Sequence, residues 1–346
     1  MNAAAPDATP PLLSVLVSAF NVEPFLRQCV DSVMHQAQSD IELLVVDDGS
    51  VDGTLALMQQ LAARHGARVR CISHARNRGV SAARNTLIDA ARGQYLWFLD
   101  GDDWVAPGVF DKLQALISHR EAPDVVLFDY RLVRRTERLK YRLRGEHHRP
   151  GFAGPSRQPI VGAAALVEGV LSTGNVFVWS YVSRRRLWAA QPGRAPLRFP
   201  EGRTFEDMAI TPRLLMRAQG GWHVPEPWVM YRRHDDSITA SMSARKVADL
   251  SCALGSARGD LMQPGHEVPA SLRFAWAHQA ARNLLAAQRH GERLPREQGR
   301  ALWGQLRADF DTAVGADLAL LRRSYWRRGW FARWLRLRQA LRRPAP

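Results

Sequence analysis

Acidic residues are concentrated in the segment 100–103, which has the sequence DGDD and directly follows an apolar run over residues 94–99. Carboxylates so close together repel one another, so the arrangement is costly unless a cation neutralises them. A divalent ion such as Mg²⁺ or Mn²⁺, held by one or two carboxylates and by phosphate oxygens of a substrate, would supply that cation. An Asp-rich turn that caps the helix starting near Pro107 explains the same residues without a metal, and both interpretations stay open.

Two further polar groups lie beside apolar runs in the first hundred residues. The segment 47–50 is DDGS, and its second carboxylate, Asp48, could accept a hydrogen bond from a ribose hydroxyl or a base N–H. Arg76, Arg78 and Arg84 surround the start of a predicted helix, where guanidinium groups suit a diphosphate or a base carbonyl. Taken alone, a β-turn with an N-cap accounts for the first group and a solvated arginine cluster for the second.

Two clusters later in the chain could take part in proton transfer and charge neutralisation. Glu206 and Asp207 stand at a predicted helix start, where a carboxylate ionised at neutral pH could act as a general base. A carboxylate pair that stabilises the helix dipole is the alternative. Arg232, Arg233 and His234 could neutralise a leaving diphosphate, or form ion pairs within a surface loop.

Several other chemistries lack their motifs. The sequence has no G-x-G-x-x-G, which disfavours a dinucleotide dehydrogenase, and no P-loop. It also has no G-x-S-x-G nucleophile elbow and no H-E-x-x-H zinc motif.

These clusters are positioned by alternating strands and helices in the first 130 residues. Short runs rich in Val, Ile and Leu alternate with helical patterns, which indicates βαβ units around a buried parallel sheet. Because ligands of such sheets bind at the carboxyl ends of the strands, we expect the polar clusters to meet along one edge. The predicted strands are 12–18, 41–46, 68–73, 94–99 and 124–129, and the predicted helices are 21–35, 54–64, 80–91 and one opened by Pro107.

The remainder of the chain is more irregular and then helical. Residues 131–159 are Arg-rich with Gly and Pro, and we expect a surface excursion or mobile loop there. Thr204 is predicted to cap a helix over 205–217. The other predicted elements are a helix over 160–171, an apolar stretch over 175–182, a short strand over 228–231, and helices over 244–261, 270–289, 296–314 and 318–342.

The formal charge of +15 comes from two segments of the chain. Residues 321–346 contain nine arginines and no carboxylate, and residues 131–149 carry eight cations against two glutamates, so together they contribute 9 + 6 = 15. With 46% hydrophobic residues the chain can bury a core, which excludes global disorder. We expect no transmembrane helix and no signal peptide. Three widely spaced cysteines indicate no disulfide framework and suit a reducing compartment.

The basic tail is predicted to form one amphipathic helix over residues 320–341. On a helical wheel Trp326, Trp330, Trp334 and Leu337 fall on one face and most arginines on the other. Such a helix is typical of binding to an anionic membrane surface. A helix packed on its own domain with a solvated basic face is the alternative, and the sequence contains no module that would indicate nucleic-acid binding.

The ordered segments SVLVSAFNVEPFLRQCVDSVMHQ, ELLVVDDGSVDGT and NRGVSAARNTLIDAARGQYLWFLDGDDW resemble glycosyltransferase family 2. FEDMAITPRLLM and YRRHDDSIT resemble the acceptor-side motifs of that family. The resemblance covers about residues 12–240. It implies an α/β fold of the GT-A type, Rossmann-like with a mostly parallel central sheet, and an inverting, metal-dependent transferase.

The resemblance also implies roles for residues of the donor site. Ser18 matches a contact of the first strand with the nucleobase, Asp48 matches the base-binding carboxylate, and Arg78 lies in a loop that approaches the nucleobase. Asp100 and Asp102 match the D-x-D motif, with Asp102 as the metal ligand and Asp100 as the ribose partner.

On the acceptor side, Asp207 matches the catalytic base of the family's E-D motif, and Arg233 and His234 fall where diphosphate contacts are often found. The helices after residue 244 lie outside the resemblance. We therefore predict a GT-A domain over residues 1–243 and a helical C-terminal region over 244–346.

The sequence thus predicts an enzyme that moves a sugar from a nucleotide-diphosphate donor, with a UDP-sugar favoured, to a hydroxyl of a lipid-linked or cell-surface glycan. The expected cofactor is Mn²⁺ or Mg²⁺, and the expected location is the cytoplasm, peripheral on the cytoplasmic face of the inner membrane. A metal-dependent nucleotidyltransferase and a non-catalytic basic membrane scaffold are the alternatives.

Overall fold

The computed structural model describes residues 10–118, 121–134, 147–233, 242–261 and 267–342. The chain divides into two compact units. The first, the sheet unit, contains residues 1–149, 179–202 and 222–232. The second, the helical unit, contains residues 150–178, 203–221 and 233–346, so it joins the predicted helical region after 244 to two earlier stretches. Among the described residues, no helix is both long enough and apolar enough to cross a membrane.

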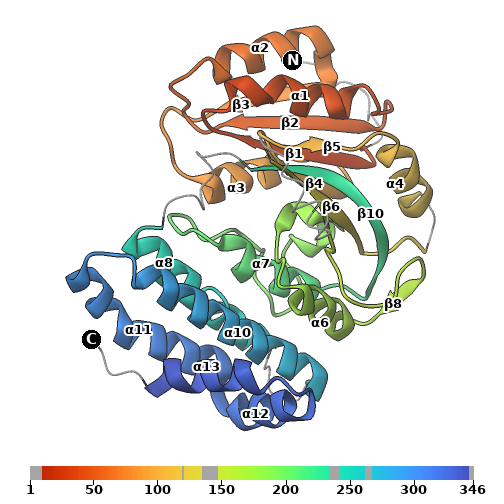
Figure 1. Cartoon of the computed structure of the whole chain (residues 1–346). Helices are drawn as coiled ribbons and strands as arrows, with labels where there is room; N and C mark the ends of the chain where they lie inside the picture. Colours follow the sequence, from red (N-terminus) through yellow and green to blue (C-terminus); the bar gives the residue numbers. More distant parts are fainter. Residues whose placement is uncertain (1–9, 119–120, 135–146, 234–241, 262–266, 343–346) are drawn as a thin grey trace. The chain divides into compact units, whose positions relative to one another are not determined.

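The sheet unit is built on a central sheet with the strand order β3-β2-β1-β4-β9-β6-β10-β5 (Figure 1). In its first half β1 pairs in parallel with β2 and β4, and β2 pairs in parallel with β3. In its second half β9 runs antiparallel between β4 and β6, so β4 and β6 keep a common direction. The strands are β1 (Leu13–Ala19), β2 (Ile41–Asp47), β3 (Val69–Ser73), β4 (Tyr95–Asp100), β5 (Trp104–Val105), β6 (Val125–Arg134), β7 (His148–Arg149), β8 (Pro159–Val161), β9 (Tyr181–Arg184) and β10 (Gly220–Arg233).

The helices of the sheet unit cover both faces of its parallel half. In Figure 1, α1 and α2 lie on one face and α3 on the other. The chain moves outward from β1 to β2 and β3 and then returns to place β4 on the other side of β1. The strand order thus reverses between β1 and β4, and at such a point α/β sheets open a crevice for ligands. β1 and β2 are apolar and buried along nearly their whole length because both faces are covered. The helices are α1 (Glu23–Met34), α2 (Thr54–His65), α3 (Val80–Ala90) and α4 (Val109–Ile117).

The expected irregular excursion over 131–159 is wrong for residues 131–134 and 148–149, which form strands, whereas residues 150–158 have no regular secondary structure. Strand β6 continues to Arg134, and β7 pairs with it antiparallel through Tyr130↔Arg149 and Arg131↔His148. Arg131 is exposed and Leu132 is buried, which is the alternation expected of a strand. The prediction of a loop was based on the Arg-rich composition and overlooked this alternation. Residues 135–146 lie outside the described residues.

The helical unit is organised around its longest helix, α10 (Ala270–Gly291), which packs against α6, α8, α11, α12 and α13. Its core side chains include Leu272, Trp276 and Leu284, each at most 2% exposed. The indole N–H of Trp276 donates to the carbonyl of Ala313 at 3.1 Å. The other helices are α6 (Ala163–Thr173), α7 (Glu206–Leu215), α8 (Ala244–Cys252), α9 (Arg258–Leu261), α11 (Arg296–Val314), α12 (Leu318–Arg327) and α13 (Phe331–Arg342).

The prediction of one continuous amphipathic tail helix is wrong. Gly329 adopts a left-handed φ of 68° and ends α12, and the chain turns before α13 begins. Trp330 N–H donates to the carbonyl of Tyr325, and Gly329 N–H donates to that of Trp326, the paired bonds of a Schellman cap. A helical wheel assumes a single axis, so it cannot anticipate this break.

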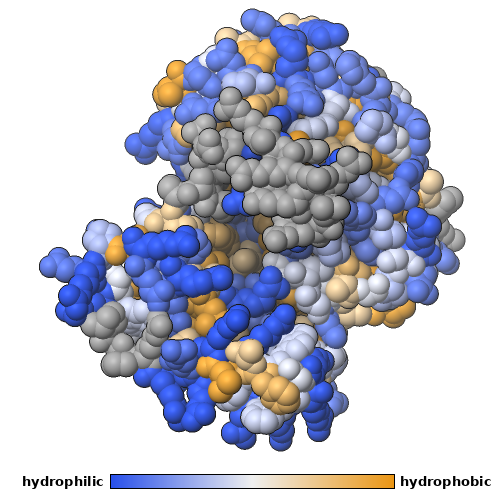
Figure 2. Space-filling model, viewed as in Figure 1, coloured by the Kyte–Doolittle hydropathy of each residue, from blue (hydrophilic) through white to orange (hydrophobic). Residues whose placement is uncertain are grey.

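The break redistributes the predicted apolar face of the tail. Leu337 is fully buried, whereas Trp326, Phe331 and Leu335 are 56%, 47% and 58% exposed. In the view of Figure 2, apolar surface interrupts the hydrophilic surface over α13 and its junction with α12. The tail therefore packs on its own unit, as the alternative interpretation expected, while three large apolar side chains remain exposed.

Candidate active site

Ser18 and Asp100 meet at the carboxyl ends of the two strands that flank the reversal of strand order. They are register partners of β1 and β4, and the Ser18 hydroxyl donates to Asp100 Oδ1 at 3.2 Å. Arg84 of α3, which is only 3% exposed, donates to the same oxygen at 3.0 Å. Since β1 must pair with β4 in this register, the sheet brings together two residues that are 82 positions apart in the sequence.

The turn after β4 carries the other two carboxylates of the DGDD segment. The N–H of Asp103 donates to the carbonyl of Asp100 at 3.0 Å, which closes the turn. Asp103 is 1% exposed, and its Oδ1 accepts from the N–H of Arg232 at 2.7 Å. Burial, reinforced by the carboxylates of Asp102 and Asp100, raises the pKa of Asp103 well above its ordinary value. The carboxylates are therefore crowded enough to favour a nearby cation.

Arg232 fastens this turn to the rest of the sheet unit. Its Nε donates to the Asp102 carbonyl at 2.8 Å, and its Nη2 donates to Gln28 at 2.6 Å. The guanidinium carbon lies 4.6 Å from the ring centroids of both Phe25 and Trp104. Arg232 thus acts as a positioning residue, a role that the run of basic residues at 232–234 did not reveal.

The donors around this turn suit a metal ion that a substrate helps to hold. In the described ranges of the chain, no group of three or more His, Cys, Asp or Glu side chains is arranged to hold a metal. Asp103 Oδ2 is buried and has no hydrogen-bond partner among the described residues. The residues present therefore do not form an all-protein cage, but the carboxylate of Asp102 with phosphate oxygens of a nucleotide would form the type of site that Mg²⁺ and Mn²⁺ occupy.

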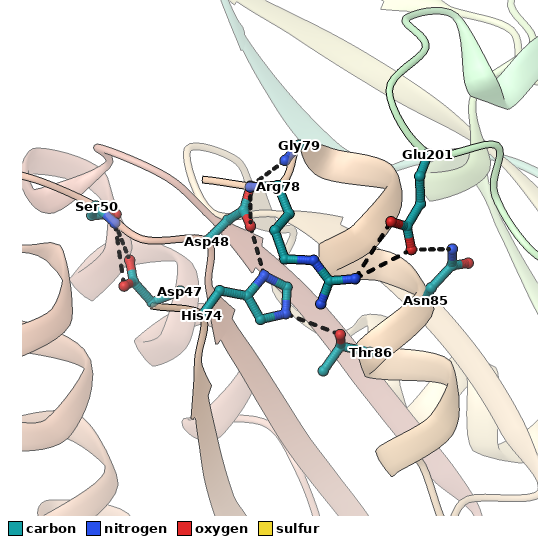
Figure 3. A network of polar contacts seen from close by, with 9 residues as sticks. All are labelled: Asp47, Asp48, Ser50, His74, Arg78, Gly79, Asn85, Thr86 and Glu201. Carbon is teal, nitrogen blue, oxygen red and sulfur yellow. Dashed lines mark hydrogen bonds and ion pairs between the residues drawn. The ribbon is translucent and has the colours of Figure 1, made fainter. Parts of the chain in front are cut away.

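Asp48 holds the loop at the start of α3. Its carboxylate lies 2.6 Å from His74 Nδ1 and accepts from the N–H groups of Arg78 at 3.0 Å and Gly79 at 2.7 Å (Figure 3). His74 Nε2 lies 3.0 Å from the hydroxyl of Thr86, which extends the network into α3. Asp48 is 3% exposed, so in this structure its carboxylate organises the loop that carries Arg78.

The neighbouring turn 47–50 is packed directly against this loop. Asp47 accepts from the N–H of Ser50 at 3.3 Å. Gly49 has a φ of +71°, and a Cβ built there would lie 2.5 Å from the carbonyl carbon of Arg76. Only glycine fits both the left-handed backbone and the close approach of the two loops.

Arg78 extends from this loop toward residues 199–201, which belong to the same unit. Its Nη2 lies 3.4 Å from Glu201 Oε2, and both side chains are about half exposed, at 47% and 49% (Figure 3). Asn85 anchors that segment through two hydrogen bonds with the backbone of Phe199, at 2.8 and 3.0 Å. Sequence reasoning missed His74 and Glu201. The position of His74 directly after β3, at the polar strand edge, was a usable signal, whereas nothing in the sequence marked Glu201.

Within the helical unit, Asp207 lies in the first turn of α7 and accepts from the N–H of Val178 at 3.2 Å. The residue before α7, Phe205, has a left-handed φ of 59°. A bulky residue in this conformation is strained, and such strain is often found at functional sites.

The predicted cap by Thr204 is wrong. Its N–H and hydroxyl both donate to Asp249 of α8, at 3.0 and 3.1 Å, so a tertiary contact takes the side chain that would have capped α7.

Arg233 is an exposed residue at the end of β10. His234 lies outside the described residues.

Comparison with known proteins identifies the family. A sequence model described as "Glycosyl transferase family 2" matches residues 14–165. The "Uncharacterized glycosyltransferase EpsJ" of Bacillus subtilis (strain 168) is 33% identical over 234 residues, which are 66% of this chain and 63% of EpsJ. Residues 14–165 therefore carry a domain of glycosyltransferase family 2. The predicted membership of this enzyme family is confirmed, and the match spans less than two thirds of the length of EpsJ.

Solved structures support the same fold. The S. aureus TarS 1–349 structure in complex with UDP has a TM-score of 0.69 at 17% identity and covers 95% of this chain and 89% of that one. Mannosyltransferase PcManGT from Pyrobaculum calidifontis, in complex with GDP-Man and Mn²⁺, has a TM-score of 0.51 at 16% identity, covering 97% and 88%. The predicted α/β architecture of the GT-A type with added C-terminal helices is confirmed.

Proposed function

We propose that this family 2 glycosyltransferase moves a sugar from a nucleotide-diphosphate donor to a hydroxyl of a glycan acceptor. The observation that carries the proposal is the meeting of Ser18, Asp100 and Arg84 at the reversal of strand order. This edge of an α/β sheet is where nucleotides bind in related architectures. The complexes of TarS with UDP and of PcManGT with GDP-Man support a nucleotide-sugar donor, and we favour a UDP-sugar.

The donor would be held by residues of the strand edge. We assign the nucleobase to Ser18, Asp48 and Arg78, and the ribose to Asp100. Because the Asp48 carboxylate already accepts from the loop that carries Arg78, its part includes holding that loop in place. We assign the diphosphate to Arg233, at the end of β10, and to His234.

Charge development explains the remaining assignments. Breaking the sugar–phosphate bond leaves negative charge on the diphosphate, much as a leaving group does in glycoside hydrolysis. A bound Mn²⁺ or Mg²⁺ would stabilise that charge. We assign Asp102 as its protein ligand, and the presence of Mn²⁺ in PcManGT supports a metal in this fold. Asp207 would take the proton of the acceptor hydroxyl on the face opposite the diphosphate, which gives inversion at the sugar carbon.

We also propose that the acceptor is a lipid-linked or cell-surface glycan and that the protein binds the cytoplasmic face of the inner membrane. The support is the tail, where Trp326, Phe331 and Leu335 are exposed beside the arginines of α12 and α13. Apolar side chains among cations suit an anionic lipid surface. Removal of residues 320–346 should abolish sedimentation with anionic liposomes, and equal sedimentation of the truncated protein would refute this part.

A screen of nucleotide-sugar donors with Mn²⁺ tests the transferase proposal. We expect release of a nucleoside diphosphate from one donor class and no release of pyrophosphate. Release of pyrophosphate in a parallel incubation with a nucleoside triphosphate and a sugar 1-phosphate would instead indicate the nucleotidyltransferase alternative, and no turnover with any substrate would favour the scaffold. Proton NMR of the glycoside product would test inversion through the configuration of the new anomeric carbon.

A further inference from the structure

The helical unit contains a pocket whose lining comes mostly from helices outside the family's shared motifs. Its volume is about 650 Å³, and it is bounded by α10 and α13 with contributions from α7 and α8. Leu250, Leu285 and Ala286 supply apolar wall, and the remaining lining is predominantly polar.

Buried amide side chains form part of the lining. Gln279 and Asn283 are 2% and 4% exposed, and Gln279 Nε2 donates to Asn283 Oδ1 at 2.9 Å. Gln279 Oε1 is buried and has no hydrogen-bond partner within the described part of the chain. Gln288 donates to the carbonyl of Ala340 at 3.3 Å and so ties α13 to the pocket wall. An amide that is buried without a full set of partners is costly, and a ligand hydroxyl would satisfy it.

Three arginines and one glutamate line the same pocket, which gives it a positive balance. Arg289 and Arg336 are exposed and pair with no carboxylate among the residues that the structure describes. Arg282 donates to the carbonyl of Thr173 at 3.3 Å. Burial, and then the nearby Arg333 cation, lower the pKa of Arg282. Arg282 and Arg333 therefore repel each other. The three lining arginines outnumber the one glutamate, so a bound anion would pair with the excess positive charge.

The pocket is lined in part by α7, the helix that carries the candidate base. Met208, the residue after Asp207, lines the pocket, and its sulfur accepts from Asn283 Nδ2 at 3.4 Å. A ligand in the pocket would thus contact the helix that carries the proposed base. We assign the pocket to the acceptor, because it shares a helix with the proposed base, whereas the proposed donor contacts belong mainly to the sheet unit.

We propose that this pocket binds an anionic carbohydrate, namely a part of the acceptor glycan that carries a carboxylate or phosphate group. The amides recognise sugar hydroxyls, the apolar wall packs against the C–H face of a sugar ring, and the arginines pair with the anion. The inference rests on the proposed function, because it places the acceptor on the unit that carries Asp207.

Calorimetric titration of the full-length protein tests the inference with three probes. These are a hyaluronan hexasaccharide, which carries carboxylates, maltohexaose with a terminal phosphate, and neutral maltohexaose. We expect one or both anionic probes to bind at low ionic strength, at least about tenfold more tightly than the neutral one. The double variant Arg289→Gln/Arg336→Gln should weaken that binding by about tenfold or more. Arg300→Gln, an exposed arginine of α11 outside the pocket, is the matched control and should bind like the wild type.

The outcomes separate this inference from the proposed function. Preference for one anionic probe identifies the charged group, and binding of both supports the shared chemistry. Failure of both, equal binding of neutral maltohexaose, or unchanged binding by the double variant would overturn the inference. Nucleotide release by the wild-type protein is measured separately, so absence of transferase activity would refute the proposed function without affecting the binding result.

Discussion

Substitution of Arg232 by methionine should release the DGDD turn from the sheet unit. The substitution removes two hydrogen bonds from a charged donor, to the Asp102 carbonyl and to Gln28, and two cation–π contacts. At about 1.5 kcal/mol for each hydrogen bond and about 0.5 kcal/mol for each cation–π contact, the sum is about 4 kcal/mol. Because Arg232 is partly exposed and its contacts share neighbours, we expect a loss of about 2–3 kcal/mol in the free energy of unfolding.

Urea denaturation measures this loss, and Arg233→Met is the matched control. The two arginines are adjacent in sequence, but Arg233 is exposed at the strand end. Arg233→Met should therefore leave the unfolding free energy within about 0.5 kcal/mol of the wild type. Nucleotide affinity of Arg232→Met should also fall, since the turn carries Asp102. Wild-type stability of Arg232→Met, or a larger loss for Arg233→Met, would show that Arg232 does not fasten the turn.

Four further predictions test individual residues. Asp207→Asn should lower transfer by about a hundredfold or more while keeping nucleotide binding, and wild-type turnover would remove Asp207 as the base. Asp102→Ala should lose the part of nucleotide binding that depends on Mn²⁺, and equal calorimetric affinities with and without Mn²⁺ in both proteins would contradict its role as a ligand. Gly329→Ala should destabilise the protein by about 1 kcal/mol, because its φ is left-handed, whereas in a continuous tail helix the same change would stabilise it. Burial lowers the pKa of His278 to about 4, so the unfolded chain takes up the proton first, and stability should fall by about 2 kcal/mol between pH 7 and pH 5. A stability profile that is equally steep in His278→Gln would assign that loss to other groups.

The order of strands and helices in the first 130 residues could be predicted from the sequence because local patterns determine it. Val, Ile and Leu runs of strand length alternate with helical periodicity, and the boundaries of β1, β2 and β4 lie within one residue of those predicted. The placement of Ser18 and Asp100 at one edge followed from the general geometry of parallel sheets. The roles of Asp102 as metal ligand and Asp207 as base stay predictions, since the structure gives the positions of these residues but does not test their chemistry.

Contacts between distant segments could not be predicted in the same way. Thr204 bonds to Asp249 instead of capping α7, and Arg232 reaches Asp102, 130 positions away. Glu201 lies beside Arg78 because Asn85 hydrogen-bonds to the backbone of Phe199, two residues before Glu201. Each pairing depends on where two backbones pass each other, which a pattern along one segment does not contain.

The sequence by itself determined the family, the α/β class and the strand-end positions of the carboxylates, since these depend on local periodicity and on motif spacing. Only the tertiary structure decided which carboxylates are buried, which arginine fastens the turn, and where the basic tail breaks. Burial and pairing depend on the packing of residues that are far apart in the chain, and the break at Gly329 depends on a backbone conformation that composition leaves open. The same packing created the polar pocket beside α7, for which the sequence offered no motif.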